Sequence, residues 1–331
     1  MTKPPGDPLP DTGPGGAPAE PRAQGSPAVT DDDPDTALYR EGLEVKALSQ
    51  WQLFRRKFFR HKAAMVSLVV LVTVFTAALL AETIAPYGYE DLDLANSTIG
   101  PTLKDNHFFG TDKLGRDYFS RVLYGTRTSV RVALVVAFLS TVLGTLIGAA
   151  AGYFGGWVEN VLMRITDLVL TLPGLAVLIA AAALLGNGSP YRVAVILALL
   201  LWTSLARIVR GSFLSLREKE FVEAAKASGA SDWRIIFRHI LPNALSPIIV
   251  NATLVVATAI LIEATLSFLG FGITPPTPAL GSLIEDGRNS MLTDWWLVTL
   301  PGLTIVLIGL CINFLGDGLR DALDPTQQVR G

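Results

Sequence analysis

The chain has 331 residues, of which half are apolar and only 17% are charged. Soluble domains carry about 25% charged residues, so this composition favours a membrane protein over a soluble enzyme. A formal net charge of −2 offers no argument for nucleic acid as a partner, and the single cysteine, Cys311, excludes an intrachain disulfide framework.

Residues 1–48 differ in composition from the rest of the chain. Proline, glycine, alanine and acidic residues dominate this segment, and large apolar side chains are scarce. Because such a segment buries too little apolar surface to offset the entropy of ordering, we expect a disordered, solvated cytoplasmic tail. No basic stretch followed by an apolar core begins near Met1, so the pattern is not that of a secretory signal peptide.

A basic cluster stands directly before the first long apolar run, which covers residues 63–85. That run is long enough to cross a bilayer. Positive charge at the foot of a span marks the cytoplasmic side of the membrane, so we expect the N-terminus in the cytoplasm. The cluster consists of Arg55, Arg56, Lys57, Arg60 and Lys62.

Further apolar runs cover residues 129–153, 161–185, 191–210, 244–270 and 296–315. The sequence therefore predicts an all-α membrane protein with six transmembrane helices and both termini in the cytoplasm. Glycine and alanine crowd the second span from Gly144 to Gly152, as expected where helices approach closely in lipid. Pro173 lies inside the third predicted span, where a kink is tolerated.

This topology places residues 87–126, 186–190 and 271–294 outside the cell and residues 211–243 inside. The internal loop is rich in arginine and lysine, as the charge rule requires. The first external segment fits the rule less well, because Arg121, Arg127 and Arg131 lie in or beside it.

The segment from Gly110 to Asp117 has the glycine spacing of a phosphate-binding loop. Arg116 and Asp117 occupy the positions of the required lysine and hydroxyl residue, and no strand pattern precedes them. We therefore exclude nucleotide binding at this segment.

The internal loop 211–243 is polar and helix-prone between two apolar runs. Good helix formers fill residues 216–228, Gly229 suits a helix C-cap, and Ser231 or Asp232 can cap a second helix. In that second helix the 3.6-residue period predicts one apolar face, and Pro242 is expected to end the helix. The face comprises Trp233, Ile236, Phe237 and Ile240. Such a ridge on a basic, rigid loop suits docking into a groove of a partner.

This loop resembles the EAA signature of the permeases of bacterial ABC importers, through Glu223–Ala224–Ala225, Gly229 and Leu241–Pro242. His239 departs from the aliphatic residue usual near that position, and Arg238 to Asn243 is similar to the peptide-importer branch. Three further stretches resemble dipeptide and oligopeptide permease C subunits: Phe109 to Ser129, Leu266 to Gly272 and Gly316 to Pro325. The resemblance covers residues 51–325.

The resemblance implies a type I ABC importer permease fold in the bacterial inner membrane, forming half of a heterodimeric pore for dipeptides or oligopeptides. It implies a sister permease subunit, one or two cytoplasmic ATPase subunits and an external substrate-binding protein, with lipid around the spans. The chain itself is expected to bind no cofactor, because ATP and Mg²⁺ belong to the ATPase subunits. The expected divisions are a tail at 1–48, a first helix with its external segment at 49–126, a permease core at 127–325 that includes the coupling loop 211–243, and a short tail at 326–331.

The resemblance implies that the loop couples the pore to the ATPase. The residues concerned are Glu223, Ala224, Ala225, Gly229, Trp233, Phe237, His239, Leu241 and Pro242. We expect Glu223 to orient the loop through an ion pair or a helix cap. Glu263 lies within the fifth predicted span, where an ionisable residue either pairs across helices or lines the pore.

The sequence contains no recognisable catalytic motif. His61, His107 and His239 are far apart, and no metal-ligand spacing links them. A membrane enzyme would need a reactive constellation, and a passive channel would not need the helix–turn–helix loop. Related importers carry glutathione or nickel, so these cargoes remain alternatives to peptides.

Overall fold

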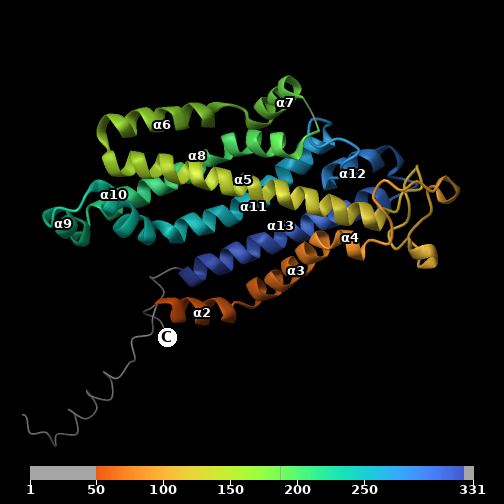
Figure 1. The fold of residues 1–331 in the computed structure, drawn as a ribbon, viewed down its shortest axis with the longest axis horizontal. Helices are drawn as coiled ribbons and strands as arrows, with labels where there is room; N and C mark the ends of the chain where they lie inside the picture. Colours follow the sequence, from red (N-terminus) through yellow and green to blue (C-terminus); the bar gives the residue numbers. More distant parts are fainter. Residues whose placement is uncertain (1–49, 187, 324–331) are drawn as a thin grey trace, which may run out of the picture. The chain divides into compact units, whose positions relative to one another are not determined.

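The computed structural model describes residues 50–186 and 188–323. The tails predicted at 1–48 and 326–331 lie outside these residues. The described residues form helices, turns and loops, with one isolated bridge between Thr111 and Asp117. The all-α prediction is confirmed (Figure 1).

The α-helices are α2 (Gln50–Arg60), α3 (Lys62–Leu79), α4 (Ala81–Ile84), α5 (Tyr118–Phe154), α6 (Gly156–Thr171), α7 (Gly174–Leu185), α8 (Pro190–Arg217), α9 (Glu220–Ala227), α10 (Asp232–Arg234), α11 (Leu245–Phe268), α12 (Leu280–Gly287) and α13 (Trp296–Leu323). Shorter helical turns are η1 (Leu94–Asn96), η2 (Lys104–Asn106), η3 (Ile235–Ile240), η4 (Leu241–Ala244) and η5 (Arg288–Ser290).

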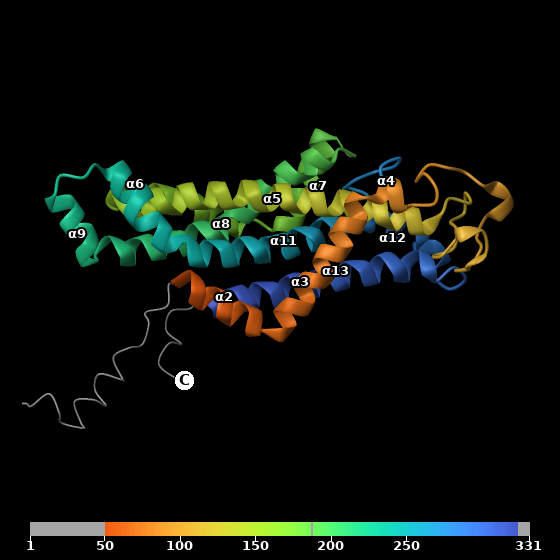
Figure 2. The ribbon, with the colours of Figure 1, turned by 60° about the horizontal axis from the view of Figure 1, so that its bottom comes forward.

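Helices α5, α8, α11 and α13 run side by side, and α3 lies against α13 (Figures 1 and 2). Each of these five helices belongs to a segment long and apolar enough to cross a membrane, and α6 with α7 can make a sixth span. One end of the bundle carries α2, α9 and α10. The other end carries α12 and the long segment before α5.

The third predicted span is not a single straight helix. It is divided into α6 and α7, whose axes differ by 86°. The break falls at Leu172, whose backbone is extended, directly before Pro173. Proline disfavours the helical conformation of the preceding residue and cannot donate a backbone hydrogen bond, so the kink expected at Pro173 becomes a full break.

The second predicted span begins eleven residues earlier than expected, because α5 starts at Tyr118 and contains 37 residues. At 1.5 Å per residue it is about 55 Å long, well beyond the ~30 Å hydrocarbon core of a bilayer. The expected division at residues 126 and 127 therefore falls inside a continuous helix. Asp117 caps this helix by accepting a hydrogen bond from the Ser120 backbone N–H.

Helices α5 and α8 make the most extensive helix–helix contact among the described residues, and three glycines of α5 make their close approach possible. A Cβ built on Gly148 would lie 2.4 Å from the Ala206 carbonyl oxygen, and one on Gly144 would lie 2.7 Å from that of Trp202. Gly152 is similarly close to Arg210. Small residues that let backbones meet are the expected means of association between helices in lipid.

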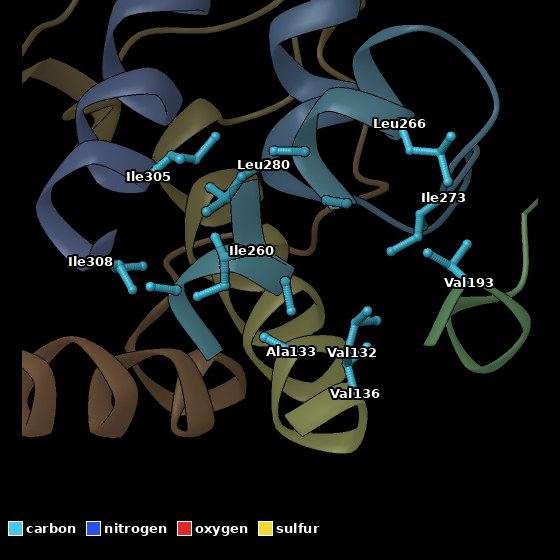
Figure 3. Close-up of a cluster of buried hydrophobic side chains, with 14 of the residues drawn as sticks. Val132, Ala133, Val136, Val193, Ile260, Leu266, Ile273, Leu280, Ile305 and Ile308 are labelled. Atoms are coloured by element: carbon cyan, nitrogen blue, oxygen red, sulfur yellow. The ribbon is translucent and has the colours of Figure 1, made fainter. Parts of the chain in front are cut away.

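The main core lies where α5, α11, α12 and α13 meet (Figure 3). Ile260 of α11 and Leu280 of α12 are fully buried there, and Ile308 of α13 joins them. Around them pack the smaller side chains Val132, Ala133 and Val136 of α5.

Candidate functional site

The internal loop contains the two short helices that the sequence predicts. Helix α9 ends at Ala227, and Gly229 has φ +75°, where other residues are strained. The Gly229 N–H bonds to the Lys226 carbonyl, and the Ala230 N–H bonds to the Ala225 carbonyl. This pair of bonds is the Schellman motif, so the predicted glycine C-cap is confirmed in detail.

The base of the loop is packed into a second core cluster. Val222 of α9 and Ile235 and Ile240 of η3 are buried there against Phe213 of α8. Buried side chains on both arms of the turn fix their relative position, since close-packed interiors yield little to deformation.

Two polar contacts fasten the loop to the ends of α5 and α8. The Tyr153 hydroxyl donates to Asp232 at 2.6 Å, and Arg217 Nη1 donates to the Tyr153 carbonyl at 2.9 Å. These three residues were not among the predicted coupling residues. Asp232 was recognised only as a cap, and no periodicity in the sequence links it to a tyrosine 79 positions earlier.

The predicted apolar face of the second helix is divided between two directions. Ile236 and Ile240 are buried in the base of the loop. Trp233 and Phe237 point away from that base, with exposed fractions of 71% and 42% and ring centroids 4.4 Å apart. The four-residue ridge is therefore wrong as a single surface, because residues 235–240 form a π-helical turn with a wider period than the α-helix assumed.

The other predicted coupling residues lie around this exposed aromatic pair or at the end of the loop. Glu223 and Ala224 are exposed on α9, and Ala225 is half-buried. Glu223 makes no ion pair or side-chain hydrogen bond within the described parts of the chain, so the expected internal partner is not found. His239 and Leu241 are half-buried, and Pro242 is exposed.

Pro242 does not separate the second loop helix from the fifth span. The backbone stays helical through η3 and η4 into α11. Residues 232–268 thus form one helical segment that is long and apolar enough to cross a membrane. Proline is accepted near the start of a helical turn, where its missing N–H is not needed. Asn243 Nδ2 donates to the His239 carbonyl at 2.6 Å and so satisfies a backbone acceptor next to the proline, which has no N–H to donate. The loop and α11 are therefore joined by a continuous helical backbone.

Glu263 lies fully buried inside the bundle. Ser129 of α5 donates to one carboxylate oxygen at 2.8 Å, and Ser267 of α11 donates to the other at 2.7 Å. The same two hydroxyls accept backbone N–H groups from Leu280 and Ile273. Of the two expected roles, this arrangement is the pairing one, and it joins α5 and α11 to the start of α12.

The segment before α5 forms a buried network of charges. Asp112 accepts from Arg121 at 2.7 Å and from Arg116 at 2.6 Å, and Arg121 also reaches Asp286 beside the last span. Gly115, with φ +73°, makes the turn that brings Asp112 and Arg116 together. The glycine spacing here thus serves a turn within an ionic network.

Two of the three arginines that did not fit the positive-inside rule form ion pairs with nearby carboxylates. Arg121 is paired as described above, and Arg127 donates to Glu82 of α4 at 2.7 Å, which lowers the pKa of that carboxyl.

The three histidines lie in different elements: His61 directly before α3, His107 in the segment before α5, and His239 in η3. His107 Nδ1 lies 2.9 Å from Asp117, and His61 Nδ1 accepts from the Ala64 N–H at the start of α3. In residues 50–186 and 188–323 no three histidine, cysteine, aspartate or glutamate side chains are grouped to hold a metal ion.

Two family models match the chain. One is described as the binding-protein-dependent transport system inner membrane component and covers residues 144–329. The other is described as the N-terminal TM domain of oligopeptide transport permease C and covers residues 49–101.

Curated relatives match over most of their length. The oligopeptide transport system permease protein OppC of Escherichia coli (strain K12) is 42% identical over 287 residues, which are 87% of this chain and 95% of that protein. The dipeptide permease protein DppC of Alkalihalophilus pseudofirmus is 40% identical and covers 85% and 92% of the two chains. The glutathione permease protein GsiD of Escherichia coli O6:K15:H31 is 42% identical and covers 83% and 90%.

A solved structure of the MetNI methionine ABC transporter in an inward facing conformation matches with a TM-score of 0.50. The match has 18% sequence identity and covers 62% of this chain and 97% of the other. The likeness concerns the fold alone.

Proposed function

Since the chain belongs to the family of binding-protein-dependent transport system inner membrane components, we propose that it forms one half of the peptide pathway of an ATP-driven importer. It is a multi-pass permease subunit of the ABC importer type. In this proposal a sister permease supplies the other half, and an external binding protein delivers the peptide.

The proposal rests chiefly on the structure of the loop between α8 and α11. Its base is buried and hydrogen-bonded, yet it holds the rings of Trp233 and Phe237 out toward solvent. Exposed aromatic pairs on a rigid support are typical anchors of protein interfaces. We assign this surface to docking in a groove of the ATPase subunit.

Charge on the loop complements the aromatic anchor. Lys226, Arg234 and Arg238 are exposed on it, and Glu223 at the first turn of α9 has no ion pair within the described part of the chain. A free carboxylate at a helix start is favoured by the helix dipole and is available to a basic residue of a partner. We therefore propose that Glu223 forms its ion pair with the ATPase subunit.

ATP and Mg²⁺ belong to the ATPase subunits in this proposal, and the chain itself hydrolyses nothing. Closure of those subunits moves the loop, and the continuous helical path from η3 to α11 carries the movement into the bundle. Coupling requires a contact that differs between two states, which a rigid loop supplies. A passive channel, which is not driven by an ATPase, would not need a rigid docking loop.

The positions of the basic groups support the proposed orientation in the membrane. Helix α2, with its exposed Arg55, Arg56 and Arg60, stands at the same end of the bundle as the loop (Figure 1). Under the positive-inside rule we propose that this end is cytoplasmic and that both termini lie on the cytoplasmic side of a bacterial inner membrane.

Peptides are the proposed cargo, because two of the matched relatives are named for oligopeptide and dipeptide transport. Glutathione is the second candidate, because a relative named for it is equally similar at 42% identity. Glutathione is itself a small peptide, so both cargoes need a pathway that accepts amide groups and carboxylates.

Docking is tested by co-purification of the chain with its ATPase subunit. We expect Trp233→Ala with Phe237→Ala to lose the complex, and Gly229→Val to weaken it by straining the turn. Leu292→Ala removes an exposed side chain from the turn between η5 and α13, away from the loop, and serves as the control. If the complex and transport survive the paired aromatic change, the docking surface lies elsewhere.

Cargo is tested by uptake of labelled dipeptide, tetrapeptide and glutathione into cells with and without this chain. Loss of peptide uptake on deletion, with recovery on re-expression, supports the proposal. Loss of glutathione uptake alone would assign the second candidate, and unchanged uptake of all three would refute both.

A further inference from the structure

Helix α2 lies directly before the first span and has one packed side and one exposed side. Phe58 is buried in a cluster with Ala64 of α3 and Ala322 of α13. The exposed side faces away from Phe58, as helical spacing requires, and consists of Gln52, Arg55, Arg56, Phe59 and Arg60. We call its three arginines together with Phe59 the basic face of α2.

The charge of the basic face is not neutralised by neighbouring residues. Its three arginines have no ion pair within residues 50–186 and 188–323. Residues 45–81 contain no aspartate or glutamate, so no acid lies within helical reach along the chain. Asp321 of α13 lies 3.8 Å from His61 instead, next to the cluster that buries Phe58. The arginines are therefore available to anions from outside the chain.

The height of α2 along the bundle suits the membrane surface. In both ribbon views α9 is the outermost helix at this end, whereas α2 begins no further out than the end of α5 (Figures 1 and 2). Helix α2 lies beside the last turns of α13, with which it is in contact. A partner in the cytoplasm therefore meets the loop first, while α2 is level with the ends of the spans.

The basic face also leads directly into a surface that suits lipid. Span α3 begins at Lys62, and Val66 and Val69 in it are 64% and 61% exposed. Arg60 precedes Val66 by six residues, about 9 Å along a helix. The interfacial layer on each side of the ~30 Å hydrocarbon core is about 5–8 Å thick, so a helix whose valines contact acyl chains holds Arg60 among the headgroups.

Phe59 distinguishes this face from a merely solvated set of charges. Its ring is 58% exposed between Arg55, Arg56 and Arg60. Helices that bind at a membrane surface combine an aromatic side chain, which enters the acyl boundary, with basic side chains that extend to the phosphates. Basic clusters immediately beside a membrane span are typical sites for anionic lipids.

We propose that the basic face of α2 binds anionic phospholipid headgroups on the leaflet beside the coupling loop. Each guanidinium donates paired hydrogen bonds to a phosphate, and Phe59 enters the acyl boundary. Because Phe58 packs α2 against α13, the bound lipid also holds the end of the last span at the level of the headgroups. The inference goes beyond the proposed function and depends neither on the cargo nor on the ATPase subunit.

The test places a fluorescent probe beside the basic face in the assembled importer. With Cys311 replaced by alanine, the exposed Ala63→Cys is labelled with monobromobimane, and the complex is placed in phosphatidylcholine nanodiscs. Quenching is measured as the mole fraction of doxyl-labelled phosphatidylglycerol is raised, and separately with doxyl-labelled phosphatidylcholine. Leu303→Cys, on the exposed surface of α13, carries the control probe.

We expect phosphatidylglycerol to reach half-maximal quenching at Ala63→Cys at a mole fraction at least tenfold below that of phosphatidylcholine. Each basic residue near an anionic surface contributes about a factor of five, and three arginines are present. The control probe should show no preference. Raising NaCl from about 0.1 M to about 1 M shortens the Debye length from ~10 Å to ~3 Å and should remove most of the preference without any substitution.

Two triple variants assign the preference to the arginines. Changing Arg55, Arg56 and Arg60 together to glutamine should reduce the preference at least fivefold. Changing the same three residues to lysine keeps their charge and should leave the preference within about twofold of the original chain. If the glutamine variant retains the full preference, anionic lipid binds elsewhere and the assignment is wrong.

Three further results would overturn the proposal, each by identifying another occupant. Quenching by neither lipid in the assembled complex would mean that a protein subunit covers the face. A preference that appears only after removal of residues 1–48, which include acidic Asp31, Asp32, Asp33 and Asp35, would assign the face to that segment. Loss of the preference in excess inorganic phosphate, at constant ionic strength, would make free phosphate the ligand.

Discussion

The close approach of α5 to α8 at Gly148 predicts that replacing this glycine by alanine destabilises the chain. The same replacement at Gly302 of α13 is predicted to stabilise it. In Gly148→Ala the new Cβ would lie 2.4 Å from the Ala206 carbonyl oxygen and 2.8 Å from Val209 Cβ. Non-bonded carbons prefer about 3.5–4.0 Å, so the two helices must separate by roughly 1 Å. Neither the carbonyl nor a β-branched Cβ can rotate away.

Overpacking of this kind costs typically 1–3 kcal/mol, and the loss of neighbouring contacts along the pair places Gly148→Ala toward the upper end. The control is Gly302→Ala in α13, where a built Cβ meets nothing within 4 Å. There alanine should stabilise by about 0.5–1 kcal/mol, because it restricts the unfolded chain and favours the helix.

The assay is the apparent Tm of the purified chain in detergent, followed by tryptophan fluorescence. We expect Gly148→Ala to lower Tm by several degrees and Gly302→Ala to raise it slightly, at roughly 2–4 °C per kcal/mol. Equal shifts of the same sign would show that the glycine contact does not limit how closely the helices approach.

Further predictions concern the network before α5, the buried glutamate and the loop. Asp112→Ala leaves Arg121 buried with a weaker partner and should cost about 3–5 kcal/mol, measured by thermal unfolding, and part of the loss should return in the double variant with Arg121→Leu. Glu263→Gln should keep the chain folded and monodisperse on size exclusion, whereas Glu263→Lys, which offers the two serines no acceptor, should abolish folding. Tyr153→Phe should cost about 0.5–1.5 kcal/mol and reduce ATPase stimulation by peptide with the complex intact, and unchanged stimulation would exclude the hydrogen bond to Asp232 from coupling.

The number and type of elements could be predicted from local pattern. Apolar runs predict spans because backbone polar groups in lipid must be satisfied within a helix, and length then decides which runs can cross. The turn at Gly229 was predictable for a similar reason, because a C-cap depends on the conformation of one residue and its neighbours.

The partners of individual side chains were decided only by tertiary structure. Glu263 could be recognised as an unusual charge, and Ser267 lies one turn further along the same helix, but the bond to Ser129 depends on how α5 packs beside α11. Likewise Ile236 points inward because the loop packs against the end of α8, and Trp233 is left exposed. Local propensity specifies elements because its causes lie within a few residues, whereas burial and pairing depend on contacts between segments over a hundred residues apart.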